Sequence, residues 1–262
     1  MRILFVGDTV GRGGKAMLFR VLAKLEGTYD FLIVNGENLT HGKGISREDY
    51  KDLLAHGVDC ITLGNHWAGV MDTERYMDEM DRLVRPLNLI GYHHGKGSRL
   101  FEKNGVKIRV TNLLGTAFMK EAVNMPYLAF SELLESTSPC IHIVDYHAEA
   151  TSEKQIFQQT FSGKVSAILG THTHVPTADS HISEGGTALQ CDVGMVGLKD
   201  GSIGASYESA FGRFIQGVNI PLDYDQLGLC EFNATLLEVD EKTFKAKSIQ
   251  RIHLEDTIDE SM

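Results

Sequence analysis

Cysteine and proline are both scarce in this chain, which has 4 Cys and 5 Pro among 262 residues. The four cysteines lie far apart and never form a C-x-x-C pair: Cys60, Cys140, Cys191 and Cys230. Each stands inside an apolar run, so we interpret all four as buried free thiols rather than as a disulfide framework or a zinc site. Thiols that stay reduced suit a cytoplasmic protein.

Long apolar runs are also absent. No stretch of about 18 apolar residues occurs, which excludes a membrane-spanning helix. The opening segment M-R-I-L-F-V-G-D has too short an apolar run for a signal peptide, and no cleavage-like segment follows it. We therefore expect a cytoplasmic protein with no membrane partner.

Basic residues are outnumbered by acidic ones. The chain has 25 Lys and Arg against 35 Asp and Glu, which gives a net charge of −10 and a pI of about 5.5. Binding a polyanion requires clustered Lys and Arg, so no long nucleic-acid groove is expected, although a local basic rim could still serve a small phosphate ester. The G-x-G-x-x-G spacing, the P-loop Lys-Ser/Thr pair and the zincin H-E-x-x-H motif are missing too.

The hydrophobic content of 42% is enough for one large core, and we expect a single domain over residues 1–262. In the first third, short apolar runs alternate with segments of helical spacing, which is typical of an α/β fold with helices on the faces of a sheet. The predicted strands are 2–7, 31–35, 58–63 and 87–92, and the predicted helices are 14–26, 46–56 (capped by Ser46) and 71–80.

The rest of the chain adds further strands. A turn at residues 103–105 joins two strands within 97–115 into an antiparallel hairpin. The alternating pattern then returns, and the C-terminal third is strand-rich, so we expect a second sheet packed on the first. The predicted elements are strands 140–145, 165–170, 187–193, 230–239 and 243–252 and a helix over 151–161, with 195–229 as a Gly-rich, loop-heavy segment near the site.

Five clusters of polar, potentially metal-binding residues follow one another along the chain, and four of them come directly after a predicted strand. Strand ends of an open α/β sheet are where such folds build their sites. Asp, Glu, Asn and His together suit Mn, Fe, Zn or Mg, which favours a two-metal hydrolytic site. The clusters are G-D-T-V-G (7–11), N-G-E-N (35–38), G-N-H (64–66), D-Y-H-A-E (145–149) and G-T-H-T-H (170–174).

Each cluster also has a simpler interpretation when it is taken alone. Asp8 could cap the next helix, Glu37 and Asn38 could form a turn, and His66 could be a surface residue. The spacing of His172 and His174 places both imidazoles on one side of an extended chain, where each can reach one of two adjacent metals.

The remaining polar candidates carry less weight. His41 lies close to Glu37 and could line the pocket, and Asp192 could support a ligand from outside. His93 and His94 are expected in an exposed loop, and the other histidines are expected to be structural or solvent-exposed: His56, His142, His181 and His253.

The ordered clusters resemble the calcineurin-like metallophosphoesterases, with three departures: Val10 and Thr171 stand where that family has His, and Glu37 replaces its bridging Asp. The chain looks like the YmdB-like branch of that family. The first and last segments that carry this likeness are M-R-I-L-F-V-G-D-T-V-G and D-V-G-M. Between them the likeness rests on N-G-E-N-x-x-H-G-K-G (35–44), I-T-L-G-N-H-W (61–67), D-Y-H-A-E-A-T-S-E-K (145–154) and G-T-H-T-H-V-P-T-A-D (170–179). It departs from that branch at 197–199 and 116–130.

The resemblance implies an α/β/β/α sandwich with two mixed β-sheets flanked by helices. It implies two divalent or mixed-valence metal ions, Fe or Mn above all, with Glu37 as the bridging ligand. Asp8, Glu37 and His174 would hold one ion, and the other would be held by Glu37, Asn65, His147 and His172.

The same resemblance implies a phosphodiesterase for small phosphodiesters, 2′,3′-cyclic nucleotides in particular. A metal-bridging hydroxide would attack phosphorus, Asn38 and His66 would contact the phosphate, and His66 would be the general acid. Two alternatives remain open: a regulatory nucleotide- or partner-binding protein with slow turnover, and a metal hydrolase of another bond type. Assembly into a homo-oligomer is also open.

Overall fold

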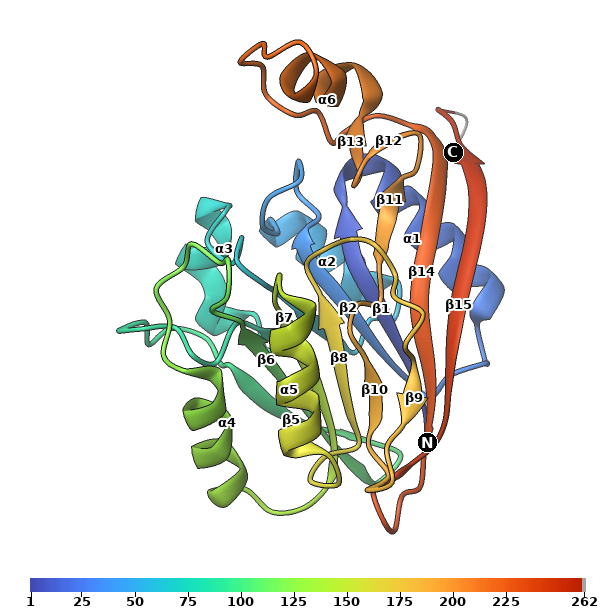
Figure 1. Ribbon diagram of the computed structural model, residues 1–262. Coiled ribbons are helices and arrows are strands. Elements are labelled where there is room, and N and C mark those ends of the chain that lie inside the picture. Colours follow the sequence, from blue (N-terminus) through green and yellow to red (C-terminus); the bar gives the residue numbers. More distant parts are fainter. Residues whose placement is uncertain (261–262) are drawn as a thin grey trace.

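Two large β-sheets pack face to face, with helices on their outer faces, in the computed structural model, which describes residues 1–260 (Figure 1). The seven-stranded sheet has the order β15 (Ala246–Ile258), β14 (Gly228–Val239), β11 (Met195–Leu198), β1 (Arg2–Val10), β2 (Phe31–Asn38), β3 (Cys60–Thr62), β4 (Leu83–Val84). The six-stranded sheet has the order β5 (Ser98–Lys103), β6 (Val106–Leu114), β7 (Ile141–His147), β8 (Ala167–Thr171), β10 (Ala188–Gln190), β9 (His181–Ile182).

Both sheets are mixed. In the first, β1 pairs in parallel with β2 and β11 but antiparallel with β14. In the second, β6, β7, β8 and β10 are parallel, while β5 and β9 pair antiparallel at the two edges. The predicted α/β class with two mixed sheets flanked by helices is therefore confirmed.

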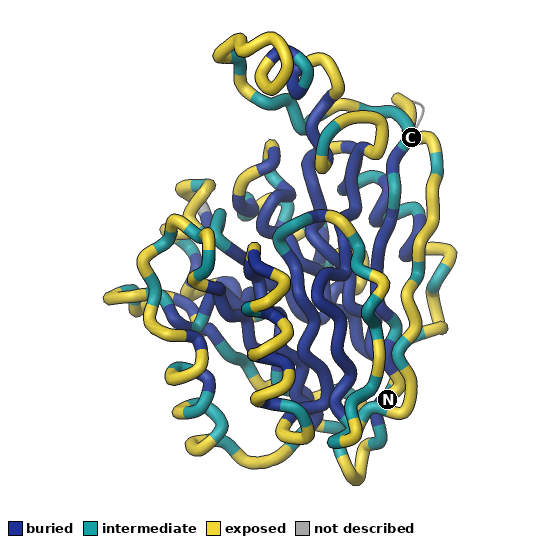
Figure 2. Tube along the Cα trace, in the orientation of Figure 1, coloured by how far each residue is buried: buried dark blue, intermediate teal, exposed yellow. Residues whose placement is uncertain are grey.

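Three apolar layers explain this arrangement. Side chains alternate along β1, so Leu4 and Val6 pack on one face of the sheet and Ile3 and Phe5 on the other, which buries the strand from Ile3 onward. The layer between the sheets contains Ile3 and Phe5. Figure 2 shows the central strands of the sheets as buried. The outer layers lie under the helices α1 (Gly11–Leu25), α2 (Arg47–Ala55), α3 (Met71–Tyr76), α4 (Pro126–Glu135) and α5 (Thr151–Phe161).

One segment projects from the sandwich, and we call residues 199–227 the arm. It contains a two-stranded hairpin, β12 (Gly201–Ser202) and β13 (Ala205–Ser206), followed by α6 (Tyr207–Phe214), and Figure 1 shows α6 standing clear of the sheets. The prediction of a loop-heavy 195–229 was wrong for β11, which lies within the first sheet, and for α6. Helix α6 is only eight residues long, too short for its periodicity to stand out.

Other predicted boundaries differ at specific points. Residues 87–92 do not form the predicted strand, because the edge strand is the shorter β4 and Asn88 bonds the main chain of Leu114 in place of a strand ladder. Helix α1 begins at Gly11 rather than near residue 14. The cap of α2 is confirmed, since the Ser46 hydroxyl accepts a hydrogen bond from the Asp49 N–H.

The cysteines are all free, but only three of them are buried. Cys60, Cys191 and Cys230 are inside, whereas Cys140 is half-buried just before β7. Within residues 1–260, no helix is both long and apolar enough to span a membrane. The predicted domain also includes residues 261 and 262, which lie outside the described residues.

Candidate metal centre

The five clusters meet at one end of the sandwich. Asp8 lies near the end of β1, and Glu37 and Asn38 end β2. Asn65 and His66 follow β3, His147 ends β7, and the loop after β8 supplies His172 and His174. Because parallel strands end at the same edge of a sheet, residues distant in sequence come together here.

Three potential ligand groups surround the Nε2 atom of His147. The Asn65 Oδ1 atom lies 2.9 Å away, the His172 Nδ1 atom 3.1 Å and the Glu37 Oε1 atom 3.2 Å. One potential ligand atom from each of Glu37, His147 and His172 lies within 4.8 Å of the other two. These are the groups that the resemblance assigns to the second metal, so the structure brings that whole set together.

The groups assigned to the first metal lie more loosely around Asp8. Its Oδ1 atom is buried and has no hydrogen-bond partner, although it lies 4.0 Å from His174 Nε2. Its Oδ2 atom accepts the His172 N–H at 3.1 Å. A buried carboxylate oxygen without a partner is costly, and a cation would compensate for it.

A glycine makes space for this cluster. A Cβ atom at Gly64 would lie 2.2 Å from Glu37 Oε2 and 2.4 Å from His147 Nε2. No side chain larger than hydrogen therefore fits between these two groups and the chain that precedes Asn65. The hard and borderline donors, the unpartnered oxygen and this space all fit divalent metal ions.

In each candidate histidine ligand, the second ring nitrogen also has a partner. His147 Nδ1 contacts the Thr171 hydroxyl at 2.8 Å, which in turn donates to Asp145 at 2.6 Å. His172 Nε2 lies 3.0 Å from a Glu149 oxygen, and His174 Nδ1 lies 2.9 Å from the Ile203 carbonyl oxygen. Such outer partners fix the tautomer and orientation of a metal-binding imidazole.

The two histidines of the 170–174 cluster do not lie on an extended chain. β8 ends at Thr171, and His172 and His174 both have positive φ, 103° and 65°. They still face one centre, but through a left-handed turn rather than through strand alternation. The physical reason predicted for their common direction was therefore wrong, although the predicted convergence is found.

Burial and mutual charge shift several pKa values here. Burial alone would raise the pKa of Glu37, but His147 and His66 outweigh it and hold that pKa well below its usual value. Burial alone would lower the pKa of His147, but the nearby Glu37 carboxylate raises it to about 9. Burial, together with the neighbouring His147, lowers the pKa of His172 to about 3. Opposite charges so close together are typical of functional sites.

His41 and Asp192, the two candidates to which the sequence gives less weight, differ in where they lie relative to the centre. His41 is exposed and pairs with Asp225 of the arm instead of joining the cluster. Asp192 does support the centre, because its Oδ2 atom accepts the Thr173 N–H at 3.1 Å and the Lys154 ammonium at 2.8 Å. His93 and His94 are exposed, as predicted.

Comparison with known proteins identifies the chain. A family model described as YmdB-like protein matches residues 4–252. The chain belongs to the YmdB-like family. A relative from Bacillus subtilis (strain 168), named 2′,3′-cyclic-nucleotide 2′-phosphodiesterase, is 39% identical over 262 residues, with 98% of each chain covered.

Solved structures of similar proteins share the YmdB-like fold. A hypothetical protein from Thermus thermophilus has a TM-score of 0.92 and 36% identity, covering 98% of this chain and 100% of that one. A protein from Mycoplasma pneumoniae described as a novel phosphatase has a TM-score of 0.91 and 39% identity, covering 98% of this chain and 94% of that one.

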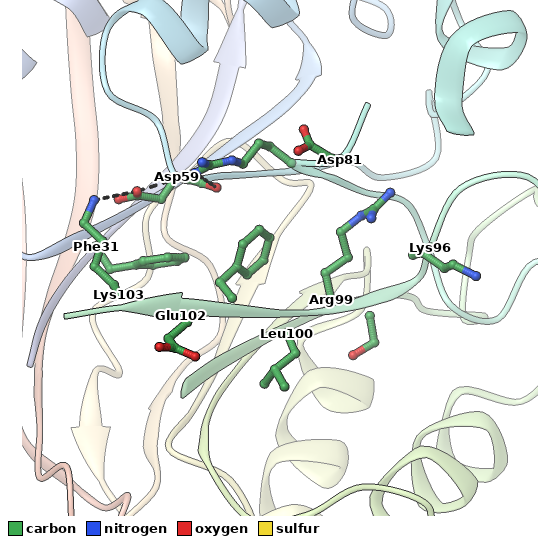
Figure 3. A pocket seen from close by; sticks show the side chains of 11 residues that line it. Phe31, Asp59, Asp81, Lys96, Arg99, Leu100, Glu102 and Lys103 are labelled. Carbon is green, nitrogen blue, oxygen red and sulfur yellow. Dashed lines mark hydrogen bonds and ion pairs between the residues drawn. The ribbon is translucent and has the colours of Figure 1, made fainter. Parts of the chain in front are cut away.

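A hollow of about 560 Å³ lies at the other end of the strands in this YmdB-like chain (Figure 3). Of the residues that line it, Phe31 begins β2 and Asp59 immediately precedes β3, whereas the candidate metal centre lies at the other ends of these strands. Several of the charged groups that line the hollow already have partners: Lys103 bonds Asp59 at 2.7 Å, and Arg99 donates to two main-chain carbonyls. We therefore place no function in this hollow.

Proposed function

We propose that the protein is a dinuclear metal-dependent phosphodiesterase that hydrolyses small phosphodiesters, with 2′,3′-cyclic nucleotides as the first candidates. The observation that carries this proposal is the convergence of Glu37, Asn65, His147 and His172 within hydrogen-bond distance around one point, beside an unpartnered Asp8 oxygen. The name of the Bacillus subtilis relative supports the substrate class.

The residues divide into two sets that share Glu37. Asp8, Glu37 and His174 would hold one ion, and Glu37, Asn65, His147 and His172 the other. When bound, two such ions, which we propose to be iron or manganese, would activate water and neutralise the phosphoryl oxygens. A carboxylate with two separate oxygens suits the shared position, and Glu37 is only 1% exposed, so it is held rigidly there.

His66 is the candidate proton donor. Its Nδ1 atom lies 3.0 Å from the Asn38 amide nitrogen, which can only donate, and 3.4 Å from Glu37 Oε1; we propose the tautomer in which Nδ1 accepts the Asn38 N–H. A neutral imidazole then carries its proton on Nε2. The His66 side chain is 35% exposed, and its Nε2 proton can be given to a leaving alkoxide. Asn38 orients this imidazole and lies beside the expected phosphate position.

The acidic charge of the chain agrees with a small substrate. A cyclic nucleotide carries one phosphate and needs no long basic groove, so a net charge of −10 does not oppose its binding. We further propose a cytoplasmic location, which the free thiols support.

The first experiment measures metal content by elemental analysis together with hydrolysis of 2′,3′-cyclic AMP. About two metal ions per chain and turnover are expected for the wild-type protein. Glu37→Ala should lose both, because it removes the shared ligand, whereas the matched control Glu184→Ala alters an exposed carboxylate and should lose neither. Metal-free wild-type protein that stays inactive with added Mn²⁺ contradicts the proposal.

A second variant separates acid catalysis from metal binding. His66→Ala should keep its metal content and lower kcat by about 10²- to 10⁴-fold, the usual contribution of a positioned general acid. An unchanged kcat would exclude His66 from that role and leave the metal assignment standing.

A further inference from the structure

The hairpin at the base of the arm has an unusual turn. β12 and β13 pair through Gly201 with Ser206 and through Ser202 with Ala205, which leaves Ile203 and Gly204 as the two turn residues. Both have positive φ, 45° and 94°. This is the pattern of a type I′ turn, in which Asn-Gly is preferred. Positive φ is strained for a β-branched residue such as Ile203.

This turn lies directly against the metal centre. The Ile203 carbonyl oxygen accepts a hydrogen bond from the Nδ1 atom of His174 at 2.9 Å. A Cβ atom at Gly204 would lie 2.7 Å from a methyl carbon of Val10, which ends β1 two residues after Asp8. The turn is therefore fixed beyond the end of β1, where Figure 1 shows β12 and β13 at the base of α6.

Stability does not explain an isoleucine at this position. Its main chain would be less strained with Asn or Gly, and its side chain is 48% exposed, so burial returns little. The hydrogen bond to His174 uses only the carbonyl oxygen, which every residue has. What isoleucine adds is an apolar surface that faces solvent beside a metal ligand.

The metal centre itself offers only polar groups to an organic substrate. Its converging groups are carboxylate, amide and imidazole, and they are suited to the phosphate. A nucleoside also has apolar faces on its base and ribose, and ligand sites normally cover these with apolar side chains. Ile203 is a half-exposed apolar residue whose main chain contacts His174, which makes it a candidate for this contact.

We infer that Ile203 is an apolar contact for the nucleoside part of the substrate, and that its backbone strain is retained for this contact. The inference rests on the proposed phosphodiesterase function and adds a specificity residue to it. An apolar contact has no hydrogen-bonding pattern, so it favours nucleotides over phosphodiesters without a base and does not select among bases.

The test compares kcat/KM of the metal-loaded protein for 2′,3′-cyclic AMP and for ethylene phosphate, a five-membered cyclic phosphodiester without a nucleoside. Ile203→Asn should lower the ratio of the two values by about 3- to 10-fold, as expected for a half-exposed apolar contact. The same variant should raise the Tm by about 2–4 °C, since Asn tolerates the turn conformation. Loss of specificity with a gain of stability is not expected from a merely structural residue.

The matched control is Ile215→Asn, the same chemical change at a 72% exposed position of the same arm, at the end of α6. It should leave the ratio unchanged. An unchanged ratio in Ile203→Asn, or a lower Tm, overturns the inference while wild-type hydrolysis of both substrates upholds the proposed function. If the wild-type protein hydrolyses neither substrate, the proposed function fails, and this inference fails with it.

Discussion

At the scale of single residues, Gly64 leaves space in the candidate metal centre, where we propose that the ions bind. A methyl group there would collide with Glu37 and His147 without altering either side chain. Gly64→Ala should therefore lower metal affinity and turnover by at least about 10-fold, comparable to the loss of a residue that supports a metal ligand. Elemental analysis after dialysis and an assay with 2′,3′-cyclic AMP measure both effects.

Gly27→Ala is a suitable control, because it adds the same methyl group where no atom lies within 4 Å. Its positive φ of 77° predicts a small loss of stability, about 1 kcal/mol, with metal content unchanged. Full metal content in Gly64→Ala would show that the ions do not occupy the space beside this glycine.

His142 makes folding stability dependent on pH. It is buried beside Thr111 and Phe130, and burial, followed by the nearby Arg109, lowers its pKa to about 3. In the unfolded chain the pKa is about 6.5, so between these values the unfolded state binds a proton that the folded state does not. Stability should therefore fall as pH falls from about 6.5 towards 3, by up to about 1.4 kcal/mol per pH unit.

His142→Gln removes this titration, so its free energy of unfolding should fall less steeply than that of the wild-type protein over the same pH range. Urea unfolding at several pH values measures the difference in slope. His181→Gln, at an exposed position of β9, serves as the control and should keep the wild-type slope. Equal slopes for wild type and His142→Gln would mean that His142 takes up its proton in the folded state.

The convergence of the candidate ligands could largely be predicted from sequence, whereas the groups that support them could not. An apolar run that is followed by Asp, Glu, Asn or His can be recognised in the sequence as a strand end with potential ligands. Glu149 and the Ile203 carbonyl could not be assigned in this way, because one is a half-exposed carboxylate and the other a main-chain atom. Only the folded chain places Ile203 next to His174.

At the scale of elements, a buried ion pair ties α5 to the loop after β10. The Lys154 ammonium lies 2.8 Å from both the Asp192 carboxylate and the Thr171 carbonyl oxygen. Lys154→Met would leave the Asp192 charge buried without its cation, which should cost about 3–5 kcal/mol of stability. Chemical denaturation of the metal-free protein measures this loss without a contribution from bound ions.

A second variant tests whether the loss comes from the orphaned charge. Lys154→Met combined with Asp192→Asn removes both charges and keeps an acceptor oxygen for the Thr173 N–H. It should be more stable than Lys154→Met alone. A double variant whose losses simply add would show that Lys154 stabilises the fold by packing and not through Asp192.

Elements with a strong periodic pattern were predictable, and short ones were not. The strands β1, β2, β7 and β8 and the helix α5 agree with prediction because each is a nearly continuous apolar run or a periodic segment. The helix α4 was not predicted, although its segment is as amphipathic as that of α5. β4 has only two residues, and its pairing with β3 is a tertiary contact.

At the scale of the whole molecule, the two sheets share one apolar layer. The strands β1, β2 and β3 of the first sheet and β6, β7 and β8 of the second contribute side chains to the same buried cluster. Neither sheet could expose this face to water, so we propose that the chain forms one domain. Calorimetry of the metal-free protein should show a single cooperative transition, and two resolved transitions would contradict this proposal.

The position of β1 has a consequence for how the protein is made. One edge of this first strand pairs with β11 and β14, from the last third of the chain, and the Asp8 N–H bonds the Gly194 carbonyl oxygen. While the ribosome is still translating the middle of the message, that edge has no partner and Asp8 has no fixed position. The growing chain therefore carries an unprotected strand for most of its synthesis, a natural place for a chaperone to bind, and the centre is completed only when translation is nearly finished.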